Sequence, residues 1–262
     1  MTMQKTFVFA FLAIAWGACS GGDGSATTES ADQALTSAST AAQQVALLQA
    51  AVPLEDGLSA EELAGLADAT DFEPSGCATV SVSGTTVTWT FEDCTGRWGL
   101  ARVSGSLTVD YRVGPRGASA EVSSSNLTLS GRPVSIQATV TRTSSGSSET
   151  LAADSQLTLE TARLGSLDWS GQVSAEWEEG GDCVTLSGTW TAAYQAASWT
   201  VQATDFQVCA SGCPSGRLTA QGPRRTYTFE ITEDGRLTWS TDAGRSGSLA
   251  LACGQGMDWT SE

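Results

Sequence analysis

Residues 101–113 have the sequence Ala-Arg-Val-Ser-Gly-Ser-Leu-Thr-Val-Asp-Tyr-Arg-Val. Every odd position is apolar or glycine, and the even positions carry arginine, serine, threonine or aspartate. A period of two is typical of an antiparallel strand with one buried face and one solvated face. The same alternation recurs over 134–140, 167–177 and 184–194. We therefore expect an all-β domain over residues 77–254, built as one large antiparallel meander of about 12–13 strands.

The way in which this sheet closes is left open by the pattern. A long meander with one apolar face has to be covered, and a curved sheet, a half-barrel and a sandwich all satisfy that need. The alternation changes phase between Val122 and Leu127 and again between Ala203 and Phe206. One extra residue in a strand produces such a shift, so we expect β-bulges at both places.

Turn chemistry fixes the register of one hairpin. A three-residue loop over 233–235 pairs Ile231 with Leu237, so that both side chains lie on the apolar face. A two-residue turn would instead place Ile231 opposite Thr238, on mismatched faces. The longer loop is therefore expected, with Gly235 in the left-handed conformation that such loops require.

The N-terminus carries a secretion signal that ends at Cys19. Lys5 precedes an apolar run over 7–16, the small residues Gly-Ala follow at 17–18, and the polar segment Ser-Gly-Gly-Asp-Gly-Ser occupies 20–25. An apolar run of about ten residues is too short for a hydrocarbon core that needs about 20. It has the length of the apolar part of a cleaved signal. The whole pattern resembles the lipobox of bacterial lipoproteins.

The resemblance implies that the signal peptide, residues 1–18, is removed and that Cys19 is lipidated with fatty acids such as palmitate. Ser20 then implies the outer membrane, because aspartate at this place favours retention in the inner membrane of enterobacteria. The periplasmic or surface orientation stays open. Trp16 stands where these signals usually carry leucine or another aliphatic residue. A secreted protein without lipid and an uncleaved anchor are the alternatives.

Two helices are expected between the anchor and the sheet. Residues 19–28 are the lipidated cysteine and a flexible tether, and 29–70 form a helical segment. An alanine-rich stretch has apolar residues at steps of three and four up to Val52, and it would be a marginal helix alone. Ser59 and Glu62 form a capping box that starts a second, short helix. Beyond the sheet, 255–262 are expected to be a C-terminal tail.

Six cysteines remain besides Cys19, and an even number in an exported protein predicts three disulfides. In the first hairpin, pairing Val82 with Trp89 places Cys77 directly opposite Cys94, within reach of a bridge on the polar face.

For the other four cysteines, Cys183–Cys209 would join the open ends of a hairpin that turns near Ala196, which leaves Cys213–Cys253. Two other connectivities of these four stay open. The short spacing from Cys209 to Cys213 is also compatible with a metal, but the chain has no histidine and no second close cysteine pair. We therefore expect no metal site there.

Composition excludes several classes of function. Lys5 is the only lysine, so the mature chain has twelve arginines against 29 acidic residues, a formal charge of −17. Such a surface disfavours nucleic acids and anionic headgroups as partners. The absence of histidine excludes Ser-His-Asp and Cys-His catalysis and the usual zinc and iron sites. No phosphate-binding loop is present, so we expect no cofactor and assign no catalytic residue.

Tryptophans and acidic pairs are the remaining candidates for chemistry. Aromatic side chains could line a sugar platform, but most lie in phase with the apolar face, which favours core packing; Trp98 and Trp259 fall outside that phase and are the candidates for exposure. The acidic pairs at 92–93, 178–179 and 233–234 occupy strand ends or turns. The tryptophans in question are Trp89, Trp98, Trp169, Trp177, Trp190, Trp199, Trp239 and Trp259.

Three function classes are compatible with these observations. The first is a non-catalytic, lipid-anchored structural or binding module of the bacterial envelope, with an envelope protein or a glycan as partner. The second is a carrier that holds a lipid or another apolar ligand in a half-barrel groove, in outline similar to the lipoprotein-sorting half-barrels. The third is a carboxylate-dependent carbohydrate-active enzyme of the glycoside hydrolase type.

Overall fold

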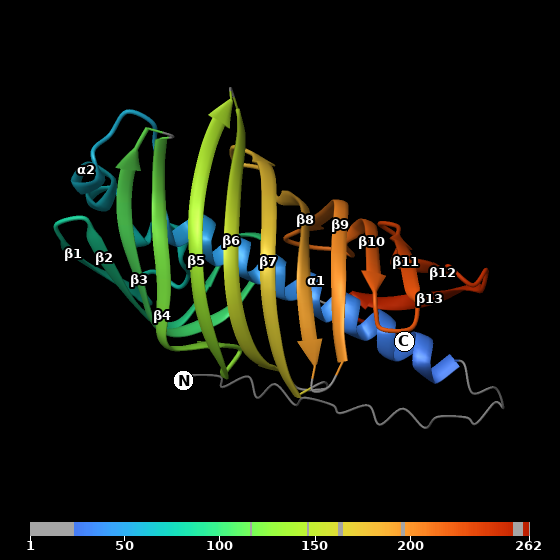
Figure 1. The fold of residues 1–262 in the computed structure, drawn as a ribbon. Coiled ribbons are helices and arrows are strands. Elements are labelled where there is room, and N and C mark those ends of the chain that lie inside the picture. Colours follow the sequence, from blue (N-terminus) through green and yellow to red (C-terminus); the bar gives the residue numbers. More distant parts are fainter. Residues whose placement is uncertain are drawn as a thin grey trace, which may run out of the picture.

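The computed structural model describes residues 24–115, 117–145, 147–161, 165–194, 197–253 and 259–261. Within them a single antiparallel sheet of fourteen strands follows the order of the chain, each strand hydrogen-bonded to the next (Figure 1). The predicted all-β meander is confirmed. Its strands are β1 (Ala78–Ser83), β2 (Thr86–Gly96), β3 (Leu100–Gly114), β4 (Gly117–Leu129), β5 (Arg132–Ser145), β6 (Ser148–Thr161), β7 (Gly165–Glu178), β8 (Cys183–Tyr194), β9 (Ala197–Cys209), β10 (Ser215–Gln221), β11 (Thr226–Ile231), β12 (Arg236–Thr241), β13 (Ser246–Cys253) and β14 (Trp259–Ser261).

The last strand, β14, adds one to the expected number. Leu251 pairs with Ser261 and Cys253 pairs with Trp259, so three residues of the expected C-terminal tail extend the sheet instead. The rest of 255–262 lies outside the described residues. Backbone pairing along β13 supplies the reason, since an edge strand offers unpaired N–H and C=O groups to any segment that can reach it.

A long helix, α1 (Gly24–Ala51), covers the inner face of the sheet (Figure 1). It begins before residue 29, so the tether expected over 19–28 is helical from Gly24 onward. At 1.5 Å per residue its 28 residues span about 42 Å, enough to cross many strands. Nearly all its described side chains are buried, on every side of the helix. The curved sheet therefore wraps around α1, and alanines permit the close approach.

Polar contacts hold α1 against the sheet at two places. The Gln43 side chain accepts a hydrogen bond from the Ala101 N–H (2.6 Å) and donates one to the Gly99 carbonyl (3.3 Å). The Tyr194 hydroxyl donates to the Gln33 carbonyl at 3.0 Å, and its burial raises the pKa of Tyr194 well above the ordinary value. These bonds satisfy backbone groups that would otherwise be buried without partners.

Short helices follow α1. The helix α2 (Ala60–Gly65) starts with the predicted capping box, in which Ser59 and Glu62 bond each other's backbone N–H groups. The hydrogen bonds from Ser59 lower the pKa of Glu62. Two 3-10 turns, η1 (Ala69–Asp71) and η2 (Arg97–Gly99), complete the irregular part.

The bulges that the phase shifts predict are present. The pairing of β4 with β5 shifts between Ser123 and Leu127, and in β4 Asn126 has a φ of 52°. In β9, Asp205 has a φ of 48°. A glycine lies against each of these residues: a Cβ on Gly105 would lie 2.2 Å from the Asn126 carbonyl oxygen, and one on Gly216 would lie 2.3 Å from that of Asp205.

The hairpin of β11 and β12 has the predicted register. Ile231 pairs with Leu237 and Phe229 with Trp239, and the loop residue Gly235 has a φ of 77°.

The first hairpin differs from the expectation by two residues. Val80, rather than Val82, pairs with Trp89, because β1 and β2 are joined by a two-residue turn whose first residue, Gly84, has a φ of 61°. Glycine at that position favours a two-residue hairpin turn. The predicted register was therefore wrong.

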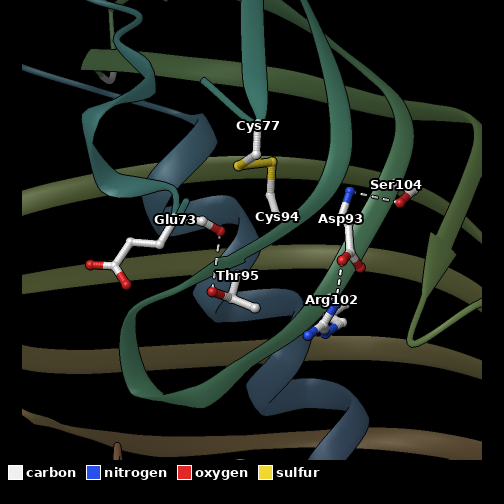
Figure 2. The surroundings of a disulfide bond; sticks show 7 residues. All are labelled: Glu73, Cys77, Asp93, Cys94, Thr95, Arg102 and Ser104. Carbon is white, nitrogen blue, oxygen red and sulfur yellow. Dashed lines mark hydrogen bonds and ion pairs between the residues drawn. A yellow bond between two sulfur atoms is a disulfide. The ribbon is translucent and has the colours of Figure 1, made fainter. Parts of the chain in front are cut away.

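The disulfide Cys77–Cys94 forms nevertheless, by another route (Figure 2). Asp93 forms a bulge with a φ of 58°, which moves the next residue, Cys94, onto the inner face. The Cα atoms of the two cysteines are 5.4 Å apart, and Cys94 is completely buried. The expected position on the polar face was wrong, because the bulge reverses the alternation.

The second disulfide, Cys183–Cys209, is confirmed with the predicted geometry. The two residues are directly opposed at the open ends of β8 and β9, with Cα atoms 4.0 Å apart. Their neighbours Val184 and Val208 are buried, so this bridge lies on the outer face. Cys213 is also disulfide-bonded. The side chain of Cys253 lies outside the described residues, and Cys213–Cys253 stays a prediction.

Candidate functional site

The outer face of the sheet carries two adjoining hollows over strands β3 to β8. The first has a volume of about 650 Å³ and the second of about 490 Å³. Both are lined by Gln137 of β5 and Gln156 of β6, so they form one continuous depression. We call it the outer groove. Its other polar lining residues include Thr108, Asp110, Glu121, Thr139, Asp154 and Asp168.

Strand register brings these side chains together from distant parts of the sequence. Asp110 pairs with Glu121, Glu121 with Thr139, and Thr139 with Asp154. Directly paired side chains share a face, and neighbouring strands lie about 4.8 Å apart. The pairing therefore produces a row of polar groups that runs across the strands, from β3 to β6.

The carboxylates of this row are partly engaged by neighbours. Thr85 donates a hydrogen bond to Asp110 at 2.9 Å, and Arg112 lies 2.6 Å from Glu121. The Gln172 amide donates to Asp154 at 3.2 Å. Hydroxyl and amide groups both donate and accept hydrogen bonds, as the hydroxyls of a sugar do. The outer groove is thus suited to a polyhydroxylated ligand.

The predicted core role is confirmed for the in-phase residues Trp89, Trp169, Trp177 and Trp190, whereas Trp199 and Trp239 are only partly buried against the core. Trp89, Trp169 and Trp190 are fully buried on the inner face, and Trp169 stacks with Trp190 at 5.8 Å between ring centroids. They form no sugar platform on the surface.

Trp98, which was expected to be exposed, is buried. It has a φ of 53° in η2, which turns the ring inward against the edge of Trp177, 5.3 Å away between centroids. Its indole N–H donates to the Gly181 carbonyl at 3.4 Å. The side chain of Trp259 lies outside the described residues.

The three acidic pairs lie on different hairpins. Asp93 forms an ion pair with Arg102 beside the first disulfide (Figure 2). Glu178 accepts a hydrogen bond from the Ser147 hydroxyl at 2.6 Å. Asp234 accepts bonds within its turn from Thr232 and from the Arg236 backbone, which lower its pKa. Each engaged carboxylate thus has a local structural role.

Several polar atoms on the inner face have no hydrogen-bond partner among the described residues. They are both amide atoms of Gln44, the indole nitrogens of Trp89, Trp169, Trp190 and Trp199, the Tyr111 hydroxyl and the Ser155 hydroxyl. Burial raises the pKa of Tyr111 well above its ordinary value. Buried polar atoms of proteins are paired in about nine cases out of ten, often with ordered water, so each of these atoms calls for a partner that is not a protein group.

Sequence reasoning missed the outer groove. The even positions of 101–113 and of the other strands indicate a wet face, but alternation alone does not show which wet residues become neighbours or where the sheet is hollowed. Gln137 and Gln156 carry no signal that separates them from other polar strand residues.

The predicted lipidation site, Cys19, and the signal peptide over 1–18 lie outside the residues that the structure describes. In the part that the structure describes, no cluster of three or more cysteine or acidic side chains is arranged to hold a metal ion. Within the same residues no helix combines the length and the apolar character needed to cross a membrane.

Comparison of the whole chain with protein-family models, with curated proteins and with solved structures finds no match.

Proposed function

We propose that this protein is a non-catalytic, lipid-anchored module of the bacterial envelope that binds a glycan strand in its outer groove. The observation that carries the proposal is the groove itself, an open polar depression that crosses strands β3 to β8. An open depression across several strands suits an extended polymer rather than a small enclosed ligand.

The arrangement of the two faces supports this assignment. Helix α1 fills the inner face, so the outer face is the one that remains accessible. The groove offers hydroxyl, amide and carboxylate groups, and the chain as a whole has a formal charge of −16. A neutral or amine-bearing glycan is compatible with such a surface, whereas a phosphate-rich polymer is repelled.

The binding test compares two double substitutions. Gln137→Ala with Gln156→Ala removes the amides shared by both hollows, and each hydrogen bond is worth about 0.5–1.5 kcal/mol. We expect retention on insoluble peptidoglycan and on β-linked polysaccharides to weaken by about tenfold. Gln202→Ala with Gln221→Ala, exposed outside the groove, is the control. Equal retention of both variants would contradict the groove as the binding site.

The anchor is tested separately. We expect the wild type to partition into the detergent phase and to incorporate a labelled fatty acid, because two or three acyl chains hold a protein stably on a membrane. Cys19→Ala should lose both properties. Partitioning of both proteins into the aqueous phase at equal mass would rule out the lipid anchor.

A second candidate function is supported by the unpaired atoms of the inner face. This function is that of a carrier, whose ligand would occupy the inner face when α1 moves away. The ligand is apolar but has polar acceptor atoms, and these would accept hydrogen bonds from the indole N–H groups of Trp169 and Trp190 and from the Ser155 hydroxyl. A fluorescent fatty-acid probe tests it. Trp169→Phe with Trp190→Phe should weaken saturable binding, and Trp177→Phe is the control. A wild type that binds no probe would contradict the carrier function.

A further inference from the structure

The last hairpins of the sheet end in two turns that lie next to each other. One turn, residues 222–225, joins β10 to β11, and the other, residues 242–245, joins β12 to β13. The Thr226 N–H, at the start of β11, donates to the Asp242 carboxylate of the second turn at 3.3 Å. Both turns therefore lie at the same end of their strands. We call the two turns together the basic end, for the charge that they carry.

Arginines outnumber acidic residues at the basic end, unlike in the chain as a whole. Arg224, Arg225 and Arg245 stand against one acid, Asp242, so three positive charges and one negative charge give +2. The side chain of Arg224 is exposed and that of Arg225 is half-buried. Within the described residues neither of these two forms an ion pair. The formal charge of −16 is thus an average that includes a local positive surface.

The charge has a direction, because the opposite end of the same hairpins is acidic. The turn between β11 and β12 contains Glu233 and Asp234 and no arginine. The hairpins therefore carry positive charge at one end and negative charge at the other. In front of an anionic surface, such an arrangement turns the basic end toward that surface.

Helix α1 begins on the same side of the molecule. The Gln43 side chain bonds the start of β3, and the Gln33 carbonyl accepts the hydrogen bond from Tyr194 at the end of β8. Followed backward along the chain, the helix thus crosses from β3 to β8 and continues past β8, where it contacts β9, β10 and β14 (Figure 1). From Gln33 back to its first residue, Gly24, it covers about 14 Å.

Strand pairing places the basic end beside this part of the helix. Tyr194 pairs with Ala197 at the start of β9, and Thr200 of β9 pairs with Gln221, the last residue of β10. The turn at 222–225 therefore lies at the same strand end as Tyr194. Neighbouring strands are about 4.8 Å apart, so β10 and β11 lie about 10–15 Å beyond β8, as far as the helix extends.

From the helix start and the local charge we infer that the basic end lies on the anionic phospholipid headgroups of the membrane that holds the anchor. The inference rests on the lipid anchor at Cys19 proposed above and is independent of glycan binding. Cys19 lies five residues before Gly24, and five residues reach at most about 18 Å. The start of α1 therefore stays close to the bilayer, and arginines near an anionic leaflet are attracted to it.

Arginine modification on the mature, lipidated protein tests this orientation. Phenylglyoxal modifies accessible arginine side chains, and peptide mapping gives the rate at each position. The protein is reconstituted in vesicles of phosphatidylglycerol with phosphatidylethanolamine, and separately in vesicles of phosphatidylcholine. We expect Arg224 and Arg225 to react about fivefold more slowly on the anionic vesicles, and salt at about 1 M should abolish this protection. Arg132, which is exposed at the start of β5, should react equally fast on both.

Two single substitutions form a matched pair. Arg224→Gln removes one charge of the basic end and should raise the rate at Arg225 on the anionic vesicles by about two- to fivefold. Arg132→Gln removes an equally exposed charge elsewhere and should leave the protection of Arg224 and Arg225 unchanged. Both substituted side chains are exposed, so the fold should persist, which thermal melting checks. Equal loss of protection in the two variants would contradict a specific contact of the basic end.

Sedimentation of the vesicles separates failure of this inference from failure of the anchor. A wild type that sediments with both kinds of vesicle, but whose Arg224 and Arg225 react equally fast on both, would overturn the orientation alone. A wild type that does not sediment with phosphatidylcholine vesicles would refute the anchor, and with it the placement of the basic end at a membrane.

Discussion

Two regions of the sheet contain the same kind of β-bulge, in which an aspartate N–H donates to a serine hydroxyl of the facing strand. The bulge has a different effect on the nearby disulfide in each region. In β2, the N–H of the bulged residue Asp93 donates to the Ser104 hydroxyl at 2.9 Å (Figure 2). In β9, the N–H of Asp205 donates to the Ser187 hydroxyl at 3.4 Å. In each facing strand a glycine follows the serine.

The disulfides show how the two regions differ. The bulge at Asp93 lies between Phe91 and Cys94, where the pairing of β2 with β3 shifts, so it transfers that cysteine to the buried face. The bulge at Asp205 leaves Cys209 in phase with the outer face, where the bridge to Cys183 is half exposed. One residue's position relative to a bulge thus decides whether a covalent bond belongs to the core or to the surface.

The largest expected effect is the loss of the buried bridge. Chain entropy alone predicts about 3 kcal/mol for either disulfide, with slightly more for Cys183–Cys209 because its loop is longer. Cys77→Ala with Cys94→Ala also removes buried sulfur, so we expect about 4–5 kcal/mol. Cys183→Ala with Cys209→Ala should cost about 3 kcal/mol. Urea unfolding measures both, and the reverse order would show that burial does not decide the difference.

Glycine substitutions test the close approach of a glycine to a bulge in the neighbouring strand, at Asn126 of β4 and at Asp205 of β9. A Cβ at Gly105 or at Gly216 would collide with a backbone oxygen, and both residues have positive φ. We expect Gly105→Ala and Gly216→Ala to destabilise the fold by a similar amount, about 3 kcal/mol. Gly131→Ala also has positive φ but meets no atom within 4 Å, so it should cost about 1 kcal/mol. A loss at Gly105 no larger than at Gly131 would contradict the close approach.

A smaller effect distinguishes a largely buried ion pair from an exposed one. The Arg142–Glu149 pair is largely buried, whereas the side chains of Arg217 and Glu230 are 57% and 61% exposed. Glu149→Gln should cost about 1–2 kcal/mol at pH 7, and Glu230→Gln less than about 0.5 kcal/mol.

The pH dependence provides the internal check for this pair. The folded pKa of Glu149 is lower than its ordinary value of 4.5, so its contribution is complete above that pH and is lost as the pH falls below it. Thermal melting from pH 7 to pH 3 should therefore bring the wild type and Glu149→Gln together. A difference in stability that stays constant over this range would contradict the assignment.

The success of sequence reasoning differed between two hairpins for a physical reason. At 233–235 the competing turn would have placed Ile231 on the wrong face, so alternation decided the register. In the first hairpin, pairing Trp89 with Val80 or with Val82 keeps all side chains on the same faces. The alternation of apolar and polar residues therefore cannot distinguish two registers that differ by two residues. The turn geometry decides between them, because Gly84 adopts the positive φ of a two-residue turn.

The site was less predictable than the strands. The outer groove depends on which solvent-exposed side chains become neighbours across strands. Trp98 shows the same limit, because a single positive φ reverses the direction that alternation assigns to it.

The placement of α1 has a consequence for the time at which the protein can fold. The helix belongs to the beginning of the chain, yet it contacts β14 at its end as well as strands between them. An alanine-rich helix has little stability before its neighbours surround it, and contacts between distant parts of a chain form slowly. Helix α1 therefore completes its contacts with the sheet only after β14 has been synthesised.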